Sequence, residues 1–239
     1  MKKKLKVGVF GACGRMGHEV SSLLAVSNEL TPQVGVDRVM AGKHPFKKFS
    51  TKMTPEVAHE ADVWIDFSAA EAMEDILSAC LRAKKPLVSG STGLSKKQEL
   101  NLKKAARKIP ILWSPNMSLG IALLRKMTRT LTLMPGADFS IYEIHHRKKK
   151  DRPSGTALRL AEDLLALTGH QPEIAVSRLG GVFGVHEVSA ATADEVITLK
   201  HTALNRTVFA QGAVTAALWI ATKKEGLYSI EDVLNLRSS

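Results

Sequence analysis

The sequence is short of the features that mark several classes of protein. Its 239 residues include two cysteines, Cys13 and Cys80, too few for a disulfide framework and without the paired spacing of a structural zinc site. The most apolar stretch, Gly212–Ala221, falls below the roughly 18 residues of a membrane-spanning helix, and Val7–Ala12 is too short for the apolar region of a signal peptide. We therefore expect a cytoplasmic protein that is not inserted in a membrane.

Aromatic residues are also scarce, at 5% of the chain, whereas positive charge is abundant. The 34 Lys and Arg residues exceed the 23 Asp and Glu residues, giving a net charge of +11. Such an excess suits a polyanionic partner or a small anionic ligand held by clustered cations. A nucleic-acid-binding module is the weaker alternative, because no Phe, Trp or Tyr lies in the long segment 145–182 that contains the main cation cluster.

The first half of the chain alternates short apolar runs with longer segments of helical periodicity. Five runs read as buried parallel strands: Lys6–Phe10, Gln33–Asp37, Val63–Phe67, Pro86–Ser89 and Ile111–Ser114. Helical spacing between them predicts three helices: Arg15–Val26, Ala70–Lys84 and Lys96–Lys108. Repeated βα units predict an α/β domain over residues 1–117, with a Rossmann-like, doubly wound parallel sheet.

The pattern changes after Leu119. A helical run through Arg129 precedes an alternating strand over Phe139–His145, and a helix is predicted over Ala157–Leu167. Alternation predicts three further strands: Val185–Ala190, Glu195–His201 and Thr207–Phe209. We expect a second, α+β domain over 118–206 on a mostly antiparallel sheet. Helical spacing over Gly212–Lys224 and the segment Leu227–Leu236 predict that 207–239 return to the first domain.

A glycine triplet follows the first predicted strand and begins the first predicted helix. Gly11, Gly14 and Gly17 allow a sharp turn whose backbone N–H groups, with the helix dipole, can meet a pyrophosphate. Asp37 lies at the end of the second predicted strand, where an acid can accept hydrogen bonds from ribose hydroxyls. The adjacent Arg38 offers a cation to a 2′-phosphate. The motif predicts a bound NADH or NADPH.

Small and polar residues follow the next three predicted strands. They are Asp66–Ser68, Ser89–Gly93 and Ser114–Met117. Ligands of open α/β sheets bind outside the carboxyl ends of the strands, so these segments are where a nicotinamide and its ribose would lie.

The segment Glu143–Thr156, EIHHRKKKDRPSGT, is the richest in chemistry. Two histidines at a strand end can supply protons near neutral pH. The lysines and the N–H groups of Ser154–Thr156 at a helix start suit a carboxylate or phosphate. A metal site is disfavoured, because the adjacent His145 and His146 point to opposite faces of a strand. We predict no metal ligands.

These segments resemble the dihydrodipicolinate reductase family over nearly the whole chain. The resemblance is carried by Gly11–Gly17, Asp66–Ser68, Ser91–Gly93, Asn116–Ser118 and, above all, by the string HHxxKxDxPSGT from His145 to Thr156. It implies a nicotinamide-dependent reductase of lysine and diaminopimelate biosynthesis, with a Rossmann-like domain and a separate substrate domain through which a tetramer assembles. The small dicarboxylate substrate would be the cyclic imine derived from 4-hydroxy-tetrahydrodipicolinate.

The resemblance also implies roles for single residues. His145 would be the acid/base residue, Lys149 the proton donor and His146 a substrate contact, while Gly155 and Thr156, with Ser154, would bind carboxylates. The implied cofactor contacts are Gly11, Gly14, Arg15, Met16, Gly17, Asp37, Arg38, Phe67, Gly90, Thr92, Ser114, Asn116 and Met117. A dehydrogenase of the same fold acting on another small dicarboxylate is the alternative.

Overall fold

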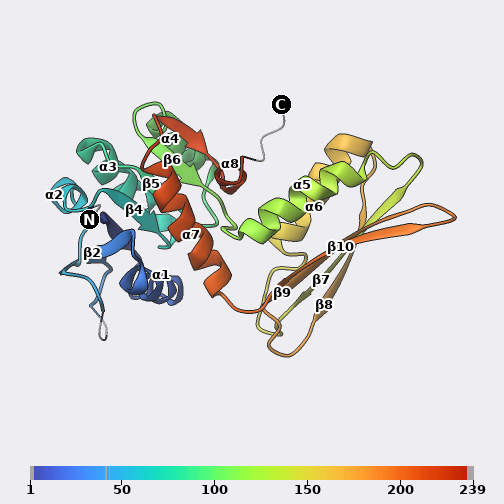
Figure 1. Ribbon diagram of the computed structural model, residues 1–239, viewed down its shortest axis with the longest axis horizontal. Coiled ribbons are helices and arrows are strands. Elements are labelled where there is room, and N and C mark those ends of the chain that lie inside the picture. The colour runs from blue at the N-terminus through green and yellow to red at the C-terminus, as the bar shows by residue number, and fades with distance from the viewer. Residues whose placement is uncertain (1–2, 41, 43, 236–239) are drawn as a thin grey trace. The chain divides into compact units, whose positions relative to one another are not determined.

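The computed structural model describes residues 3–40, 42 and 44–235, and the chain forms two compact units (Figure 1). The first unit runs to Ser118 and resumes at Phe209, and the second spans Leu119–Val208. The first unit is therefore discontinuous in sequence, with the second inserted into it.

A seven-stranded sheet forms the centre of the first unit. Its strands are β1 (Leu5–Phe10), β2 (Leu30–Val36), β3 (Lys48–Ser50), β4 (Val63–Asp66), β5 (Leu87–Ser89), β6 (Pro110–Trp113) and β11 (Gly226–Tyr228). They pair in parallel in the order β11-β6-β5-β4-β1-β2-β3. The order reverses direction at β1, which is where doubly wound sheets bind ligands. The predicted Rossmann-like α/β class is confirmed.

The helices of this unit are α1 (Arg15–Val26), α2 (Pro55–His59), the 3₁₀ turn η1 (Ala70–Ala72), α3 (Met73–Ala83), α4 (Lys96–Ala105), α7 (Thr207–Ile220) and α8 (Ile230–Val233). In α3, Ile76, Leu77 and Cys80 recur at helical spacing and are buried against Trp64 and Leu87 of the sheet. Burial raises the pKa of the Cys80 thiol, with the Asp66 charge adding to the effect. Among the described residues, no helix is both long and apolar enough to cross a bilayer.

The second unit has a four-stranded sheet in the order β10-β9-β7-β8. Its elements are α5 (Leu119–Leu131), β7 (Asp138–His145), α6 (Gly155–Thr168), β8 (Glu173–Arg178), β9 (Gly184–Ala191) and β10 (Val196–Ala203). Strands β7 and β8 are parallel, and the other pairs are antiparallel, as predicted for a mostly antiparallel sheet. Helices α5 and α6 lie on one face (Figure 1), where Leu124, Leu160 and Leu164 pack against Ile141 and Val188.

The strand predicted over Thr207–Phe209 is wrong. These residues form the first turn of α7, because three alternating residues are too few to separate a strand from the start of a helix. Strands β3 and β8 and helix α2 have no counterpart among the predictions. Strand β8 matters most, because it carries Arg178. Of the predicted segment Leu227–Leu236, the final residue lies outside the described residues.

Candidate functional site

Two positions accept only glycine where β1 leads into α1, one in the loop and one in the helix. Gly11 has a left-handed backbone, with φ +79°, and a Cβ there would lie 2.8 Å from the carbonyl oxygen of Phe67. A Cβ on Gly17, in the first turn of α1, would lie 2.2 Å from the carbonyl oxygen of Gly11. The start of the helix therefore packs directly against the backbone of the loop.

The N-terminus of α1 is suited to an anion. Within the described chain, no side chain caps the helix at Gly14, and its first turn holds no acid while Arg15 is exposed there. The first N–H groups of a helix lack partners within it and carry partial positive charge, which suits a pyrophosphate. Met16 is half-buried in the same turn.

Asp37 lies directly beside this loop, after the end of β2. Its Oδ2 accepts a hydrogen bond from the N–H of Cys13 at 2.8 Å, and its Oδ1 accepts one from the N–H of Arg38 at 2.8 Å. The carboxylate is thus fixed at the loop, and its further lone pairs can accept from ribose hydroxyls. The Arg38 side chain is exposed. The donors and acceptors present fit the pyrophosphate and ribose of a dinucleotide.

A buried carboxylate organises the neighbouring strand ends. Asp66, at the end of β4, accepts hydrogen bonds from the N–H and hydroxyl of Ser68 at 2.9 and 2.6 Å. It also accepts from the hydroxyls of Ser89 at 2.7 Å and Ser91 at 2.8 Å. The ends of β4 and β5 are thereby joined through one fully buried side chain. The sequence analysis did not assign this role to Asp66.

The remaining predicted cofactor residues lie along the same edge. The Phe67 ring covers Gly90 so closely that a Cβ there would lie 2.2 Å from it. Thr92 is exposed beyond β5, and the Ser114 hydroxyl donates to the carbonyl of Asn116 at 2.7 Å beyond β6. Met117 is buried, and its carbonyl oxygen would lie 1.8 Å from a Cβ on Gly212 of α7. All these positions follow the carboxyl ends of parallel strands, as a dinucleotide site requires.

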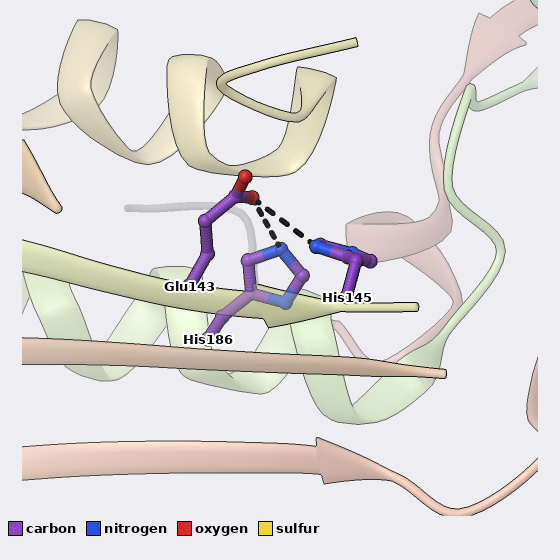
Figure 2. Close-up of side chains that lie close together, drawn as sticks. All are labelled: Glu143, His145 and His186. Atoms are coloured by element: carbon purple, nitrogen blue, oxygen red, sulfur yellow. Dashed lines mark ion pairs between the residues drawn. The ribbon is translucent and has the colours of Figure 1, made fainter. Parts of the chain in front are cut away.

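In the second unit, a buried carboxylate and two imidazoles converge (Figure 2). Glu143 and His145 lie on β7, and His186 lies opposite Glu143 on β9. Glu143 Oε2 is 3.5 Å from His145 Nδ1 and 3.7 Å from His186 Nε2. The two rings meet edge to face, with centroids 5.1 Å apart. His145 is paired with His186, from another strand, and not with its neighbour His146, which lies just beyond β7.

Arg178 of β8 joins this group to the lysine-rich loop. Its guanidinium lies 3.3 Å from Glu143 Oε1 and donates to the backbone carbonyls of Lys149 and Asp151. Lys149 Nζ makes an ion pair of 3.0 Å with Asp151, and its side chain is 24% exposed, whereas Lys148 and Lys150 are exposed. The structure thus distinguishes Lys149 from its two neighbours.

The start of α6 completes the group. Ser154 is the N-cap: its hydroxyl accepts from the N–H of Ala157 at 3.2 Å and lies 3.2 Å from His186 Nε2. Its own N–H donates to Glu143 Oε1 at 3.1 Å. Ser154 is buried, and both its N–H and its hydroxyl already interact with other groups of the protein. Gly155 is exposed and Thr156 is half-buried in the first turn of α6. Of the predicted anion-binding turn, Gly155 and Thr156 are the more accessible part.

His145 and His186, drawn in Figure 2, differ in the charges that act on their pKa values. Burial lowers the pKa of His145; the Glu143 carboxylate opposes this shift, and Lys149 and Arg178 reinforce it. Burial, with the charge of His145 next in effect, lowers the pKa of His186 to about 3. His186 is therefore neutral near pH 7, and His145 is the one of the two that more readily takes up a proton.

The pKa of Asp151, the acid of the lysine-rich loop, is also lowered, and for a carboxyl group this favours the charged form. Partial burial would raise the pKa of Asp151, but the hydrogen bond and charge of Lys149 and the backbone N–H groups of Asp151 and Gly155 outweigh it. The pKa of Asp151 therefore lies below its ordinary value, and the carboxylate stays ionised beside Lys149.

The sequence analysis predicted no metal ligands, but the structure brings together three side chains of a kind that metals bind. The donor atoms of Glu143, His145 and His186 lie within 4.8 Å of one another, and imidazole with carboxylate is a donor set that transition metals accept. The positive charge of Arg178, 3.3 Å from the same carboxylate, already balances its charge and disfavours a dication there. Arg178 and His186 were missed because their proximity to Glu143 arises from strand pairing.

A glycine-rich loop between a parallel strand and a helix in one unit, and buried histidines beside a lysine-rich loop and a helix start in the other, are typical of a nicotinamide-dependent oxidoreductase. Comparison with known proteins narrows this class. The family described as "Dihydrodipicolinate reductase, N-terminus" matches residues 5–117, and "Dihydrodipicolinate reductase, C-terminus" matches residues 118–234. The chain belongs to the dihydrodipicolinate reductase family. The predicted family and the assignment as an NAD(P)H-dependent reductase are confirmed.

Individual relatives agree with this family. The chain is 47% identical to the 4-hydroxy-tetrahydrodipicolinate reductase of Bdellovibrio bacteriovorus over 97% of both chains. It is 39% identical to that of Sulfurimonas denitrificans, over 97% of this chain and 100% of the relative. Among solved structures, the dipicolinate-bound dihydrodipicolinate reductase from Paenisporosarcina sp. TG-14 shares the fold, with a TM-score of 0.84 at 20% identity, covering 96% of this chain and 99% of the other.

Proposed function

We propose that this chain reduces the cyclic imine derived from 4-hydroxy-tetrahydrodipicolinate to tetrahydrodipicolinate, the reaction for which its relatives are named. The observation that carries the proposal is the grouping of His145, Lys149 and the first turn of α6 at one end of the second unit, joined through Glu143 and Arg178. This group offers both a proton and cationic partners for carboxylates.

The second unit supplies the proton and the anion-binding groups. Reduction of a conjugated imine adds a hydride and a proton, and negative charge develops as the hydride arrives. His145 and Lys149 are the groups placed to deliver the proton. The N–H and hydroxyl of Thr156 and the Lys149 ammonium bind the substrate carboxylates, with Gly155 and His146 as further contacts.

The first unit binds the cofactor, which supplies the hydride when bound. The α1 N-terminus with Arg15 and Met16 binds the pyrophosphate, Asp37 binds ribose hydroxyls, and Arg38 binds a 2′-phosphate when one is present. Phe67, Gly90, Thr92 and the segment Ser114–Met117 line the nicotinamide end. We propose that both NADH and NADPH serve, because Asp37 favours the first and Arg38 the second.

We further propose that four copies assemble through the second unit. Helices α5 and α6 cover one face of its sheet (Figure 1), and the other face carries the side chains of Tyr142, Val196 and Thr198, all exposed in the single chain. A second copy of the same sheet would bury this face. Light scattering coupled to size exclusion measures the assembly. The expected location is the cytoplasm, where two thiols, Cys13 and Cys80, stay reduced.

The deciding experiment is a spectrophotometric assay of NADH and NADPH oxidation. The substrate is generated in the cuvette by the enzyme that condenses pyruvate with aspartate semialdehyde. We expect turnover with this substrate and none with other small dicarboxylates that lack the ring. Absence of turnover with both cofactors would contradict the proposal, and turnover with a different dicarboxylate alone would support the alternative dehydrogenase.

A further inference from the structure

Glu143 has no part in the reaction as described, yet its carboxylate contacts the groups that do. It is fully buried, and its Oε1 accepts from the Ser154 N–H at 3.1 Å and lies 3.3 Å from the Arg178 guanidinium. Its Oε2 faces His145 Nδ1 at 3.5 Å and His186 Nε2 at 3.7 Å (Figure 2). One side chain thus connects the proton-exchanging histidine to the cap of α6 and to the arginine that holds the lysine loop.

The direction of these contacts determines where the hydrogens are. An ionised carboxylate only accepts hydrogen bonds. The Arg178 guanidinium beside Oε1 supplies the positive charge that a buried carboxylate needs. An imidazole nitrogen that faces Oε2 must therefore carry a hydrogen to be attracted to it. For His145 that nitrogen is Nδ1, which leaves the lone pair of the neutral ring on Nε2.

We propose that Glu143 is a positioning residue that holds neutral His145 as the Nδ1–H tautomer, so that Nε2 is the nitrogen that exchanges a proton with substrate. The 3.5 Å contact is longer than a good hydrogen bond, as catalytic contacts often are before substrate binds. His186 shares the same carboxylate and keeps the His145 ring edge-on. The kinetic consequence rests on the proposed reductase function, whereas the tautomer does not.

The first test uses the unaltered protein and needs no activity. Nitrogen-15 labelling of histidine, with two-dimensional NMR above the pKa of His145, distinguishes a protonated ring nitrogen from an unprotonated one. The His145 signals are identified by their loss in His145→Gln. We expect a protonated Nδ1 and an unprotonated Nε2. The reverse tautomer would overturn the proposal.

The second test is Glu143→Gln, which keeps the size of the side chain and removes its charge. The amide N–H can donate to Nδ1, so the tautomer should reverse and kcat should fall about ten- to a thousand-fold, while the KM for dinucleotide changes less than about two-fold. The charged and titratable groups facing His145 are Glu143, Lys149, Asp151, Arg178 and His186. Loss of the Glu143 charge should move the pH–rate limb governed by His145 to lower pH.

The matched control is Asp163→Asn in the same unit. Asp163 of α6 makes a two-pronged ion pair with Arg125 of α5 at 2.8 and 2.9 Å, away from the histidines. Its loss should lower the stability of the unit while kcat and the His145 tautomer stay unchanged. Equal losses of kcat in the two variants, or an unchanged tautomer in Glu143→Gln, would show a structural role only. If Glu143→Gln does not fold, the tautomer of the unaltered protein decides. An inactive unaltered protein would contradict the proposed function and leave the tautomer result standing.

Discussion

Gly17 lies against the carbonyl oxygen of Gly11 so closely that a methyl group on it would approach that oxygen to 2.2 Å. Five residues separate the two glycines, including the N-cap Gly14 and the first two residues of α1, and their contact packs the start of α1 against the loop that follows β1. The contact involves backbone on both sides, so neither partner can rotate away as a side chain would. The glycine at this position is therefore required by packing, in addition to any close approach of a ligand.

This contact predicts unequal effects for two glycine substitutions in one motif. Gly17→Ala should lower the free energy of unfolding by about 2–4 kcal/mol and abolish dinucleotide binding, because backbone must shift to admit the Cβ. Gly14→Ala is the control, since its Cβ would lie 3.2 Å from the same oxygen, a distance that a small shift relieves. Chemical denaturation and cofactor fluorescence measure both. Equal stability of the two variants would contradict the prediction.

His145→Gln should lower kcat by roughly 10²–10⁴-fold, the range expected when a positioned proton-transfer group is lost. Dinucleotide affinity should change little, because the predicted cofactor residues all belong to the first unit. Steady-state kinetics with titration of the cofactor separate the two quantities. Unchanged turnover would exclude His145 from proton transfer.

Cofactor preference should be weak. Asp37 repels a 2′-phosphate and Arg38 attracts it, so the kcat/KM values for NADH and NADPH should differ by no more than about ten-fold, or about 1.4 kcal/mol. In Arg38→Ala the ratio should move toward NADH. A preference above roughly a thousand-fold in the parent protein, about 4 kcal/mol, would show that this pair does not set the balance.

Pyridine-2,6-dicarboxylate should compete with substrate and not with dinucleotide, because it carries two carboxylates on a ring that does not readily accept hydride. Thr156→Val should weaken it by on the order of 1.5–3 kcal/mol, ten-fold or more. Lys149→Ala should also weaken it, whereas Lys148→Ala and Lys150→Ala should have small effects, since both side chains are exposed. Equal losses of inhibitor affinity in the three lysine variants would contradict a specific site and indicate only a diffuse electrostatic attraction.

Stability should fall on acidification through His186. Its folded-state pKa of about 3 lies below the ordinary value of 6.5, so between these values the unfolded chain takes up a proton that the folded chain does not. The free energy of unfolding should decrease by up to about 1.4 kcal/mol per pH unit as pH falls from about 6.5 toward 3. In His186→Gln the slope should be shallower in urea titrations at pH 7, 5.5 and 4.5. An unchanged slope would mean that other groups dominate.

The elements of the first unit could be predicted from the sequence because its strands are continuous apolar runs separated by helices, a pattern that local sequence shows directly. Those of the second unit were less predictable. Strand β8 has no fully buried residue and only two large apolar residues, Ile174 and Val176, so its local apolar signal is weak, and it pairs in parallel with β7 after an intervening helix. Thr207–Phe209 alternated by chance at the start of a helix whose small residues, such as Ala210 and Ala213, bury on one face.

Some residues of the candidate site could likewise be predicted from local sequence, and others could not. The glycine loop, Asp37 and the first turn of α6 could be predicted because each is a local signal at a strand end or a helix start. The partners of His145 could not, because Glu143 meets His186 through the register of β7 with β9, and Arg178 through β8. The one usable signal was Glu143 itself, a charged residue at a position where the alternation of β7 predicts burial.

The discontinuity of the first unit has a consequence for how the protein is made. Strand β11, which pairs with β6, and helix α7, whose Gly212 packs on the backbone of Met117, are both translated after the whole second unit. Until the segment from Gly212 to Tyr228 has left the ribosome, the backbone at Met117 and the edge of β6 that pairs with β11 stay uncovered. The inserted unit can fold first, and the nucleotide-binding unit is completed only afterwards.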